Sequence, residues 1–294
     1  CIRDRSMTIL VTGANGQLGR ETVLALEMGG ESFVGIDRDE LDFSRPDQVT
    51  AAIADYSADW VINCGAYTQV DKAEEEHELA FTVNRDAARA VAEGVKQSGG
   101  RLVHVSTDFI FGGEKSSPYN ESDIANPLGV YGQSKLEGEN AVKEVLPEAV
   151  ILRTAWVYGI HGHNFVKTML RLAAERQELR VVDDQIGSPS YTADIVNAIS
   201  ALMASGASGT WNFTNEGVAS WYDFACEIVE VAEQNGLPVI AERVLPIPTE
   251  DFPLPATRPA NSVLSKKKIR GLLDYPIPHW KTSLRTMVKQ LSAL

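Results

Sequence analysis

MTILVTGANGQLG, residues 7–19, is the stretch that decides the fold. Its first six residues form a short apolar run rich in β-forming residues, which predicts a buried strand. The turn Gly13-x-x-Gly16-x-x-Gly19 follows at once, and the residues after it have the apolar spacing of a helix. Glycines let the backbone approach a pyrophosphate and the start of a helix offers N–H donors, so the stretch predicts a dinucleotide-binding site. The spacing differs from the commoner Gly-x-Gly-x-x-Gly pattern, and a plain strand–helix turn is the alternative.

The second expected strand, residues 32–36, leads into Asp37 and Arg38. A carboxylate about 20 residues after the glycine turn can accept hydrogen bonds from the adenosine ribose of a dinucleotide. The neighbouring guanidinium can instead pair with a 2′-phosphate, so NADH and NADPH both stay open as cofactors. Asp42 follows shortly afterwards and is a candidate for contact with the adenine amine.

Strands and helices alternate over the first half of the chain. The expected elements after the second strand lie at residues 60–64, 80–97, 102–105, 130–146 and 150–152. This alternation predicts an α/β fold, a Rossmann-like doubly wound parallel sheet with right-handed crossovers, over residues 7–156. Residues 1–6 are polar and unpatterned, and we expect them to be an extension outside the fold.

The regular alternation of expected strands and helices ends after residue 156. The expected elements are a helix at 165–174, a strand at 180–182, a helix at 191–204, a strand at 210–213 and a helix capped by Ser220. We expect residues 157–294 to form mainly a smaller C-terminal substrate-binding lobe that closes over the substrate, with some segments returning to the Rossmann domain.

The composition narrows the class of protein. The chain has 294 residues, of which 44% are hydrophobic and 23% charged, as is ordinary for a soluble globular protein. A net charge of -13 and a pI near 4.9 argue against general binding to nucleic acid or to an anionic membrane, although a local pocket can still take an anionic small substrate. No apolar run is long enough to span a membrane. The three cysteines show no metal or disulfide pattern, which fits a reducing cytoplasm.

Tyr131 and Lys135 are the candidate catalytic pair. They are four residues apart, so on a helix their side chains share one face. An ammonium beside a phenol favours the phenolate, which allows proton exchange near neutral pH. Ser106-Thr107-Asp108 ends the strand expected at 102–105, and ligands of open parallel sheets bind outside such strand ends. An isolated Tyr-x-x-x-Lys spacing is most often an exposed helix turn, but together with the other two motifs it favours one shared site.

Two further features are assigned to structure rather than to function. His104 lies inside an apolar strand and is expected to be a core histidine with its hydrogen bonds satisfied. The charged run at residues 71–78 is expected to be a solvated helix face.

The three motifs together resemble those of the extended short-chain dehydrogenases/reductases, and the flanking sequence is similar to that of the dTDP-4-dehydrorhamnose reductases. The similarity keeps its order from about Met7 to the end of the chain. Its further motifs are Val61-Ile62-Asn63, Ala66-Tyr67-Thr68, Val70-Asp71-Lys72-Ala73-Glu74, Gly138-Glu139, Arg153-Thr154, Trp156-Val157-Tyr158, Asn164-Phe165, Asp184-Gln185, Gly187-Ser188-Pro189, Ser220-Trp221-Tyr222 and Arg258-Pro259.

The resemblance implies reduction of the 4-keto group of dTDP-4-dehydro-L-rhamnose to dTDP-L-rhamnose by NADPH or NADH. It makes Tyr131 the proton donor, Lys135 the residue that holds the nicotinamide ribose and lowers the tyrosine pKa, and Thr107 the hydroxyl that orients the carbonyl, with Asp108 tuning the local proton affinity. The residues expected at the cofactor are Gly13, Asn15, Gly16, Gln17, Leu18, Gly19, Asp37, Arg38, Asp42, Phe43, Cys64, Gly65, Ala66, Tyr67, Ser106, Tyr131 and Lys135. The residues expected at the substrate are Thr107, Asp108, Tyr131, Trp156, Asn164 and Arg258.

The chain departs from the family pattern in two places. After Ser-Thr-Asp the family has Tyr-Val-Phe-Asp-Gly, whereas this chain has Phe109-Ile110-Phe111-Gly112-Gly113, which leaves the reaction intact and alters fine substrate contacts. Some family members hold magnesium at a dimer interface through carboxylates that include C-terminal ones. Residues 275–294 contain no Asp or Glu, so we expect no metal site here. A homodimer stays open.

Three alternatives remain at this point. One is a reductase of another 4-keto nucleotide sugar, such as the dihydrostreptose type. Another is an epimerase or dehydratase of the same fold, although a dehydratase needs an acid–base pair next to Thr107 and position 109 is Phe rather than Glu. The third is a non-catalytic regulatory subunit of methionine adenosyltransferase, against which the intact Tyr131 and Lys135 argue.

Overall fold

Six strands form one sheet at the centre of the structure, a computed structural model that describes residues 7–293. The strands are β1 (Thr8–Thr12), β2 (Ser32–Ile36), β3 (Trp60–Asn63), β4 (Arg101–Thr107), β5 (Val150–Thr154) and β10 (Gly209–Asn212). Their order is β10-β5-β4-β3-β1-β2, and every pairing is parallel. Because β2 and β3 lie on opposite sides of β1, the strand order switches there, and the Rossmann-like doubly wound fold is confirmed. The extension expected at residues 1–6 lies outside the described residues.

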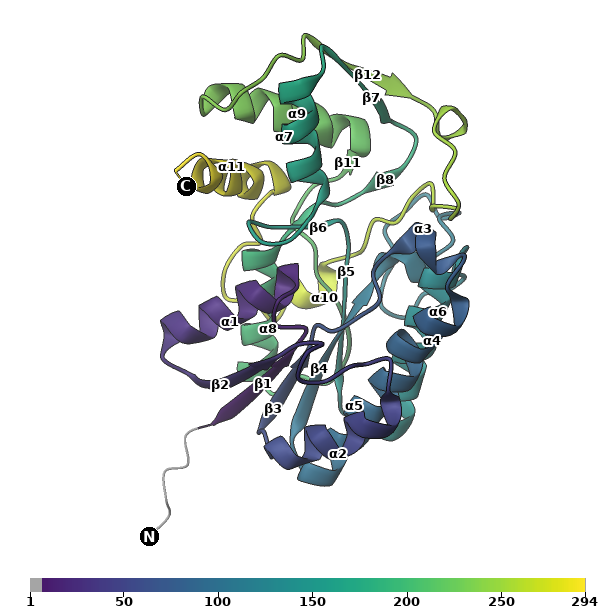
Figure 1. Cartoon of the computed structure of the whole chain (residues 1–294), viewed down its shortest axis with the longest axis vertical. Helices are drawn as coiled ribbons and strands as arrows, with labels where there is room; N and C mark the ends of the chain where they lie inside the picture. Colours follow the sequence, from purple (N-terminus) through teal and green to yellow (C-terminus); the bar gives the residue numbers. More distant parts are fainter. Residues whose placement is uncertain (1–6, 294) are drawn as a thin grey trace.

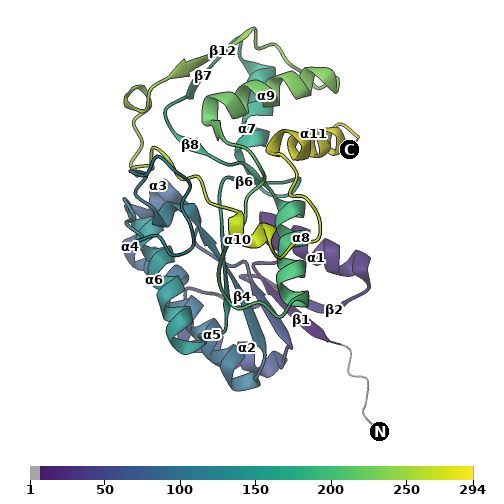
Figure 2. The ribbon, with the colours of Figure 1, turned by 180° about the vertical axis from the view of Figure 1, so that it is seen from behind.

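Helices cover both faces of this sheet, which is why its strands are almost continuously apolar. The helices α2 (Pro46–Tyr56), α5 (Ala87–Ser98) and α6 (Val130–Val145) lie on one face, and α1 (Gln17–Gly29) and α8 (Thr192–Ala204) lie on the other (Figures 1 and 2). Side chains alternate between the two cores along each strand. Leu10 of β1 packs with the first group of helices, whereas Ile9 and Val11 pack with the second.

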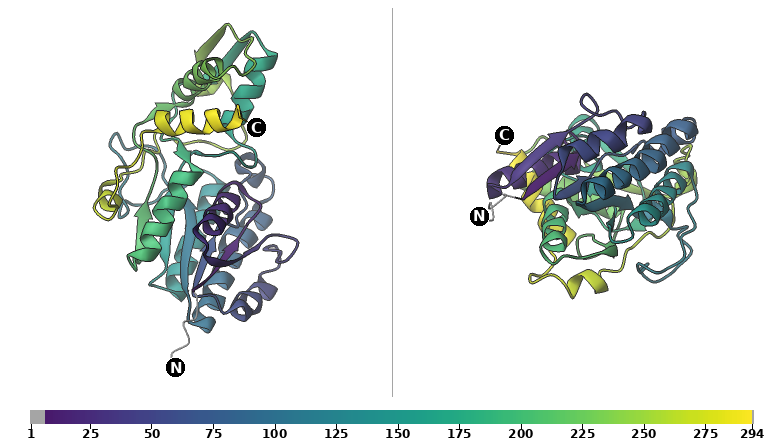
Figure 3. Two further views of the ribbon diagram at one scale, coloured as in Figure 1. Left: turned by 90° about the vertical axis from the view of Figure 1, so that its left-hand side faces the viewer. Right: turned by 90° about the horizontal axis from the view of Figure 1, so that it is seen from below.

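A smaller lobe lies beyond the carboxyl ends of the strands (Figure 1; Figure 3, left). It consists of α7 (Phe165–Glu175), β7 (Glu178–Val182), α9 (Trp221–Gln234), β12 (Arg243–Ile247) and α11 (Trp280–Leu291), with β7 and β12 paired in parallel. Its core contains Phe224 and Trp280, and a capping box at Ser220 and Asp223 confirms the cap expected for α9. The chain enters this lobe after β5, returns to the sheet as α8 and β10, and then crosses to the lobe again.

Short elements connect these parts. They are α3 (Val70–Ala73), α4 (His77–Phe81), the π-helix η1 (Thr82–Asp86), the 3₁₀-helix η2 (Asp108–Ile110), β6 (Val157–Tyr158), β8 (Ile186–Gly187), β9 (Ser190–Tyr191), β11 (Ala219–Ser220), the 3₁₀-helix η3 (Thr249–Asp251) and α10 (Lys267–Arg270). Among residues 7–293, no helix combines the length and the apolar character needed to cross a bilayer.

The structure corrects the interpretation of the charged run at residues 71–78. The run is not one solvated helix face, because it is split between α3 and α4 and three of its carboxylates have specific partners. Asp71 pairs with Arg258, Glu74 accepts a hydrogen bond from the backbone N–H of Val130, and Glu76 accepts one from the hydroxyl of Tyr67. The helix expected at 80–97 is likewise interrupted, by the π-helix η1.

Candidate active site

A cleft of about 1560 Å³ opens at the carboxyl ends of the strands, between the sheet and the smaller lobe. The glycine turn after β1, the segment after β3, the end of β4 and the start of α6 line its lower wall. Trp156, Phe165, Arg180 and Trp221 belong to the opposite wall. The cleft therefore brings together the three motifs that the sequence placed far apart.

The glycine turn is built for close backbone approach. Gly13 has a φ of +65°, and a Cβ atom on it would lie 2.7 Å from the backbone nitrogen of Gly65. A Cβ atom on Gly19 would lie 2.0 Å from the carbonyl oxygen of Gly13, so only glycine lets α1 pack under the turn. Gly16 is the N-cap of α1 and offers no side chain to the first N–H groups of the helix. These donors line the cleft and fit the pyrophosphate of a dinucleotide.

The glycine turn and the start of α1 together form a cradle for the dinucleotide, and Asp37 lies at its far end. Its carboxylate accepts hydrogen bonds from the backbone N–H groups of Asn15 and Arg38, each at 2.7 Å. Arg38 lies at the rim of the cleft with 79% of its side chain exposed, 3.9 Å from a carboxylate oxygen of Asp42. Asn15 does not line the cleft, and it contributes through the backbone bond to Asp37 rather than through a direct wall contact.

Tyr131 and Lys135 lie one turn apart on α6 and both line the cleft. Burial raises the pKa of Tyr131 to about 12, while the Thr107 hydroxyl acts in the opposite direction. The pKa of Tyr131 is therefore raised in the free site rather than lowered as expected. The reason is burial of the phenol, and the Lys135 ammonium donates to the carbonyl oxygen of Val105 at 2.7 Å. At neutral pH Tyr131 is a protonated phenol, which is the form that can donate.

Thr107 and Asp108 lie where β4 ends and η2 begins. The Thr107 hydroxyl accepts a hydrogen bond from the backbone N–H of Phe109 and donates one to Asp108, both at 3.2 Å. Burial raises the pKa of Asp108 to about 7, while the Ser262 and Thr107 hydroxyls act in the opposite direction. Asp108 therefore changes charge near neutrality, directly beside the hydroxyl that faces the cleft.

Ser106 and Cys64, both expected at the cofactor, line the cleft. The hydroxyl of Ser106 donates to the buried carboxylate of Glu139 at 2.6 Å. Burial raises the pKa of the Cys64 thiol to about 12. Gly65 packs against the ring of Phe43, where a Cβ atom would lie 2.8 Å from the ring. His104 is buried in β4, with its Nδ1 3.0 Å from the Asn63 amide. Its Nε2 has no hydrogen-bond partner among the described residues. The expected burial of this histidine is therefore confirmed, whereas the expected satisfaction of its hydrogen bonds is wrong.

Asn84 supports this site from behind, a role that was not predicted. Its side chain is buried in the π-helix η1, bonds the backbone N–H and carbonyl of Tyr67, and donates to the Ser134 hydroxyl at 3.0 Å. It thereby joins the segment after β3 to the helix that carries Tyr131. The helix expected at 80–97 carries several other polar and charged side chains, so Asn84 had no distinct signal, and the π-helix turn that directs it inward has no visible sequence pattern.

Aromatic rings form the wall contributed by the smaller lobe. Trp156 stacks on Trp221 with ring centroids 3.5 Å apart and planes 6° apart, and Phe165 packs against Trp221. Trp156 has a φ of +47°, a conformation rare for a bulky residue. A Cβ atom on Gly187 would lie 2.5 Å from the indole ring, so a glycine is needed behind it.

Of the remaining two residues expected at the substrate, Arg258 lines the cleft and Asn164 does not. Arg258 lines the cleft and forms a two-pronged ion pair with Asp71, at 2.5 and 2.6 Å, which joins the C-terminal segment to α3. Asn164 does not line the cleft. Its oxygen caps α7 at the N–H of Lys167, and its amide donates to Gln17 and to the carbonyl of Gly159. Its polar atoms are thus used within the protein, and the structure does not bring it to the substrate wall.

A phenol, an ammonium and a threonine hydroxyl at the open end of a dinucleotide cradle are the arrangement of the extended short-chain dehydrogenases/reductases, and the doubly wound sheet around them is of the same class. Among the described residues, no group of three or more His, Cys, Asp or Glu side chains is placed to hold a metal ion, and the expectation of no metal stays a prediction.

The chain belongs to the family described as the RmlD substrate binding domain, whose model matches residues 7–293. It is 42% identical to a dTDP-4-dehydrorhamnose reductase of Burkholderia thailandensis, over 97% of this chain and 99% of the relative. It is 39% identical to a dTDP-4-keto-6-deoxy-D-glucose reductase of Streptomyces niveus, over 97% of each chain. A crystal structure of dTDP-4-dehydrorhamnose reductase from Bacillus anthracis in complex with NADP superposes with a TM-score of 0.90 at 37% identity, covering 97% of this chain and 99% of that one. The family resemblance is confirmed.

Proposed function

We propose that this chain reduces the 4-keto group of dTDP-4-dehydro-L-rhamnose to give dTDP-L-rhamnose, with NADPH or NADH as the hydride source, in the biosynthesis of cell-surface polysaccharide. The observation that carries the proposal is the meeting of Tyr131 and Thr107 at the cradle, inside one cleft of about 1560 Å³. That volume exceeds the usual range for a single small ligand, so a dinucleotide and a sugar nucleotide can lie end to end. The family membership supplies the class of substrate.

The protein's part in the reaction is proton delivery and charge stabilisation. The bound cofactor supplies a hydride to the carbonyl carbon. The electron pair of the carbonyl π bond moves to the oxygen, and Tyr131 gives that oxygen its phenolic proton. The Thr107 hydroxyl has a single proton, which it donates to Asp108 in this structure; turned toward the carbonyl, the same hydroxyl is the second donor to the developing oxyanion.

Lys135 assists the same proton transfer through its positive charge. Its ammonium lies one helical turn from Tyr131 and has 3% of its surface exposed. In this buried position its charge stabilises the phenolate that remains after proton transfer, until the tyrosine is reprotonated from solvent. We also assign Lys135 to the ribose of the nicotinamide, as the family resemblance implies.

The sugar nucleotide is assigned to the aromatic wall. The stacked rings of Trp156 and Trp221 offer an apolar surface to a 6-deoxysugar, and Arg258 offers a cation near the boundary of the two lobes. We place the enzyme in the cytoplasm, without nucleic acid or membrane partners, and retain a homodimer as its possible assembly. The relative from Streptomyces niveus makes another dTDP-linked 4-keto-6-deoxysugar the second candidate substrate.

The test is a spectrophotometric assay of NADPH and NADH oxidation with each of the two 4-keto sugars generated in situ. We expect turnover with dTDP-4-dehydro-L-rhamnose, and a loss of about a hundredfold or more in kcat for Tyr131→Phe, with cofactor binding retained. Faster turnover of dTDP-4-keto-6-deoxy-D-glucose would transfer the assignment to the second candidate. Cofactor binding without turnover of either sugar would favour the regulatory-subunit alternative.

A further inference from the structure

Glu139 is a buried carboxylate close to the active site that the proposed reaction does not use. It lies on α6 with 0% of its surface exposed. Its oxygens accept hydrogen bonds from Nε and Nη2 of Arg153 at 2.9 and 2.7 Å, from the Ser106 hydroxyl at 2.6 Å and from the Lys143 ammonium at 3.1 Å. Arg153 belongs to β5 and Ser106 to β4. One side chain thus joins the catalytic helix to two strands of the sheet.

Its place on the helix relates it to the reaction. Tyr131, Lys135 and Glu139 follow one another at intervals of four residues, so they lie along one face of α6, directed toward the sheet. Ser106, which Glu139 holds, immediately precedes Thr107. The Glu139 contacts therefore hold its carboxylate on the face of α6 that carries Lys135, close to the end of β4.

A buried ion pair is a weak source of stability, since desolvation of both charges offsets their attraction. The presence of a buried ion pair this close to the active site therefore needs an explanation other than stability. We propose that Glu139 is a positioning residue for the reduction assigned above: held against β4 and β5 by Ser106 and Arg153, its carboxylate keeps the neighbouring Lys135 ammonium protonated at the pH of catalysis.

The charges that face Lys135 support this role. Burial lowers the pKa of Lys135 to about 8, and Glu139 acts in the opposite direction, followed by Cys64. Cys64, after β3, is a neutral thiol, because burial raises its pKa to about 12. His104 in β4 is a neutral imidazole, because burial lowers its pKa to about 3. The Tyr131 phenol is also neutral.

Glu139 itself stays ionised across the working range. Burial opposes its charge, but the hydrogen bonds and charge of Arg153, with Lys143 and Ser106, outweigh burial and lower its pKa to about 2. It is therefore a constant negative charge on the face of α6 that carries Lys135, partly balanced by the Arg153 and Lys143 cations that it binds. Without it, the neutral amine would be favoured at a lower pH.

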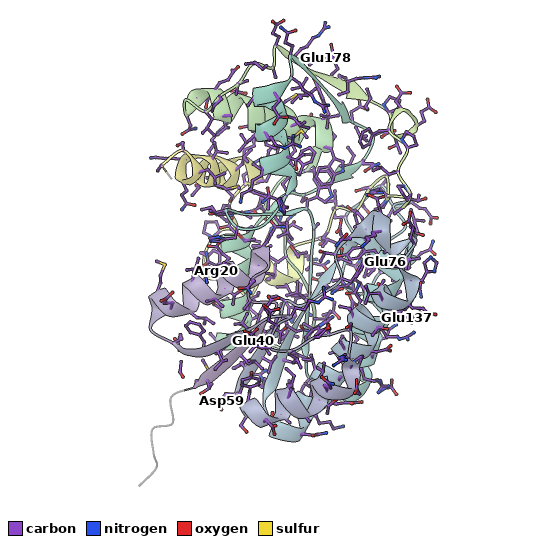
Figure 4. The ribbon with its side chains drawn as sticks, viewed as in Figure 1. Arg20, Glu40, Asp59, Glu76, Glu137 and Glu178 are labelled. Atoms are coloured by element: carbon purple, nitrogen blue, oxygen red, sulfur yellow. The ribbon has the colours of Figure 1, made fainter. Side chains whose placement is uncertain are left out.

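The test compares Glu139→Gln with Glu137→Gln. Glu137 lies two residues away on the same helix (Figure 4). Its side chain is 34% exposed and pairs with Arg85 at 3.2 Å. In Glu139→Gln we expect the alkaline limb of the kcat–pH profile to move about one pH unit lower. We expect the dissociation constant for NADPH to match the wild type near pH 6 and to be about tenfold weaker above pH 8. Glu137→Gln should change neither quantity.

A merely structural role gives a different result. Loss of activity and affinity by the same factor at every pH, with an unmoved alkaline limb, would overturn the proposal. If Glu139→Gln fails to fold because Arg153 is left unpaired, the double variant Glu139→Gln/Arg153→Gln replaces it, and a smaller shift in the same direction is expected. An unchanged pH dependence in the folded double variant would also refute it. The NADPH titration needs no sugar, so it decides this inference even where the sugar assignment fails.

Discussion

Asp108 gives the sharpest test of the electrostatics at the end of β4. Its pKa is raised from 3.8 to about 7 because the carboxyl is buried. Between these two values the folded protein binds more protons than the unfolded chain, so the free energy of unfolding falls as the pH rises through this window. The contribution of the protonated carboxyl is complete below pH 3.8 and is lost above pH 7. At 1.36 kcal/mol for each pKa unit, the whole difference amounts to about 4 kcal/mol.

Asp108→Asn removes the ionisation and keeps the shape of the side chain. We expect the variant, relative to the wild type, to gain about 3 kcal/mol between pH 5 and pH 7, and the gain to level off by pH 8. Any cost of placing an amide there is the same at each pH and does not affect the slope. The measurement is urea unfolding at several pH values, evaluated as the difference between variant and wild type.

Asp123→Asn is the matched control. The Lys115 ammonium, at 2.5 Å, lowers the pKa of Asp123 below 3.8, so this carboxylate is fully ionised from pH 5 to pH 8. The control should therefore lose a constant amount of stability over that range. A pH-independent difference for Asp108→Asn as well would show that Asp108 ionises freely, and the reasoning from burial would be refuted.

Three further outcomes are expected. Lys135→Met should lower kcat and NADPH affinity together, since the ammonium serves both; a kcat defect with unchanged affinity would remove its cofactor role. Arg38→Ala should weaken NADPH relative to NADH by about 1 kcal/mol, the low end for a charge-assisted contact because the side chain is 79% exposed; equal ratios of the two dissociation constants before and after the change would show that Arg38 points elsewhere. Trp156→Ala should raise KM for the sugar nucleotide and leave NADPH affinity unchanged. It should lower the unfolding free energy by about 1 kcal/mol, because the stacking on Trp221 is lost. A large fall in Tm with an unaltered KM would rule out the substrate role.

The sheet and the cradle were predictable because local signals specify them. The apolar run and glycine turn at residues 7–19 determine strand, turn and helix within one short segment, and the predicted ends of the sheet strands differ from the observed ones by two residues at most. Tyr131, Lys135 and Thr107 were placed together by two rules: the helical period and the position of ligands at strand ends.

The parts that failed depend on contacts between distant residues. Asp71 looked like a surface charge, since its partner Arg258 is 187 residues away. Asn164 looked like a ligand contact, but its amide bonds Gln17 across the two lobes. The raised pKa of Tyr131 comes from burial, which neighbouring residues in the sequence do not reveal. No sequence period encodes such long-range partners.

The position of β10 at the edge of the sheet has a consequence for how the chain folds. Residues 150–154 of β5 lie fully inside the protein, and the outer side of this strand is covered by Gly209–Asn212. A nascent chain that has reached only residue 156 therefore presents an open, strongly apolar β-strand edge of the kind that recruits other chains. The nucleotide-binding half cannot close before about 56 further residues have been made, and this late pairing slows folding. A stable fragment of this half must include α8 and run at least to residue 212.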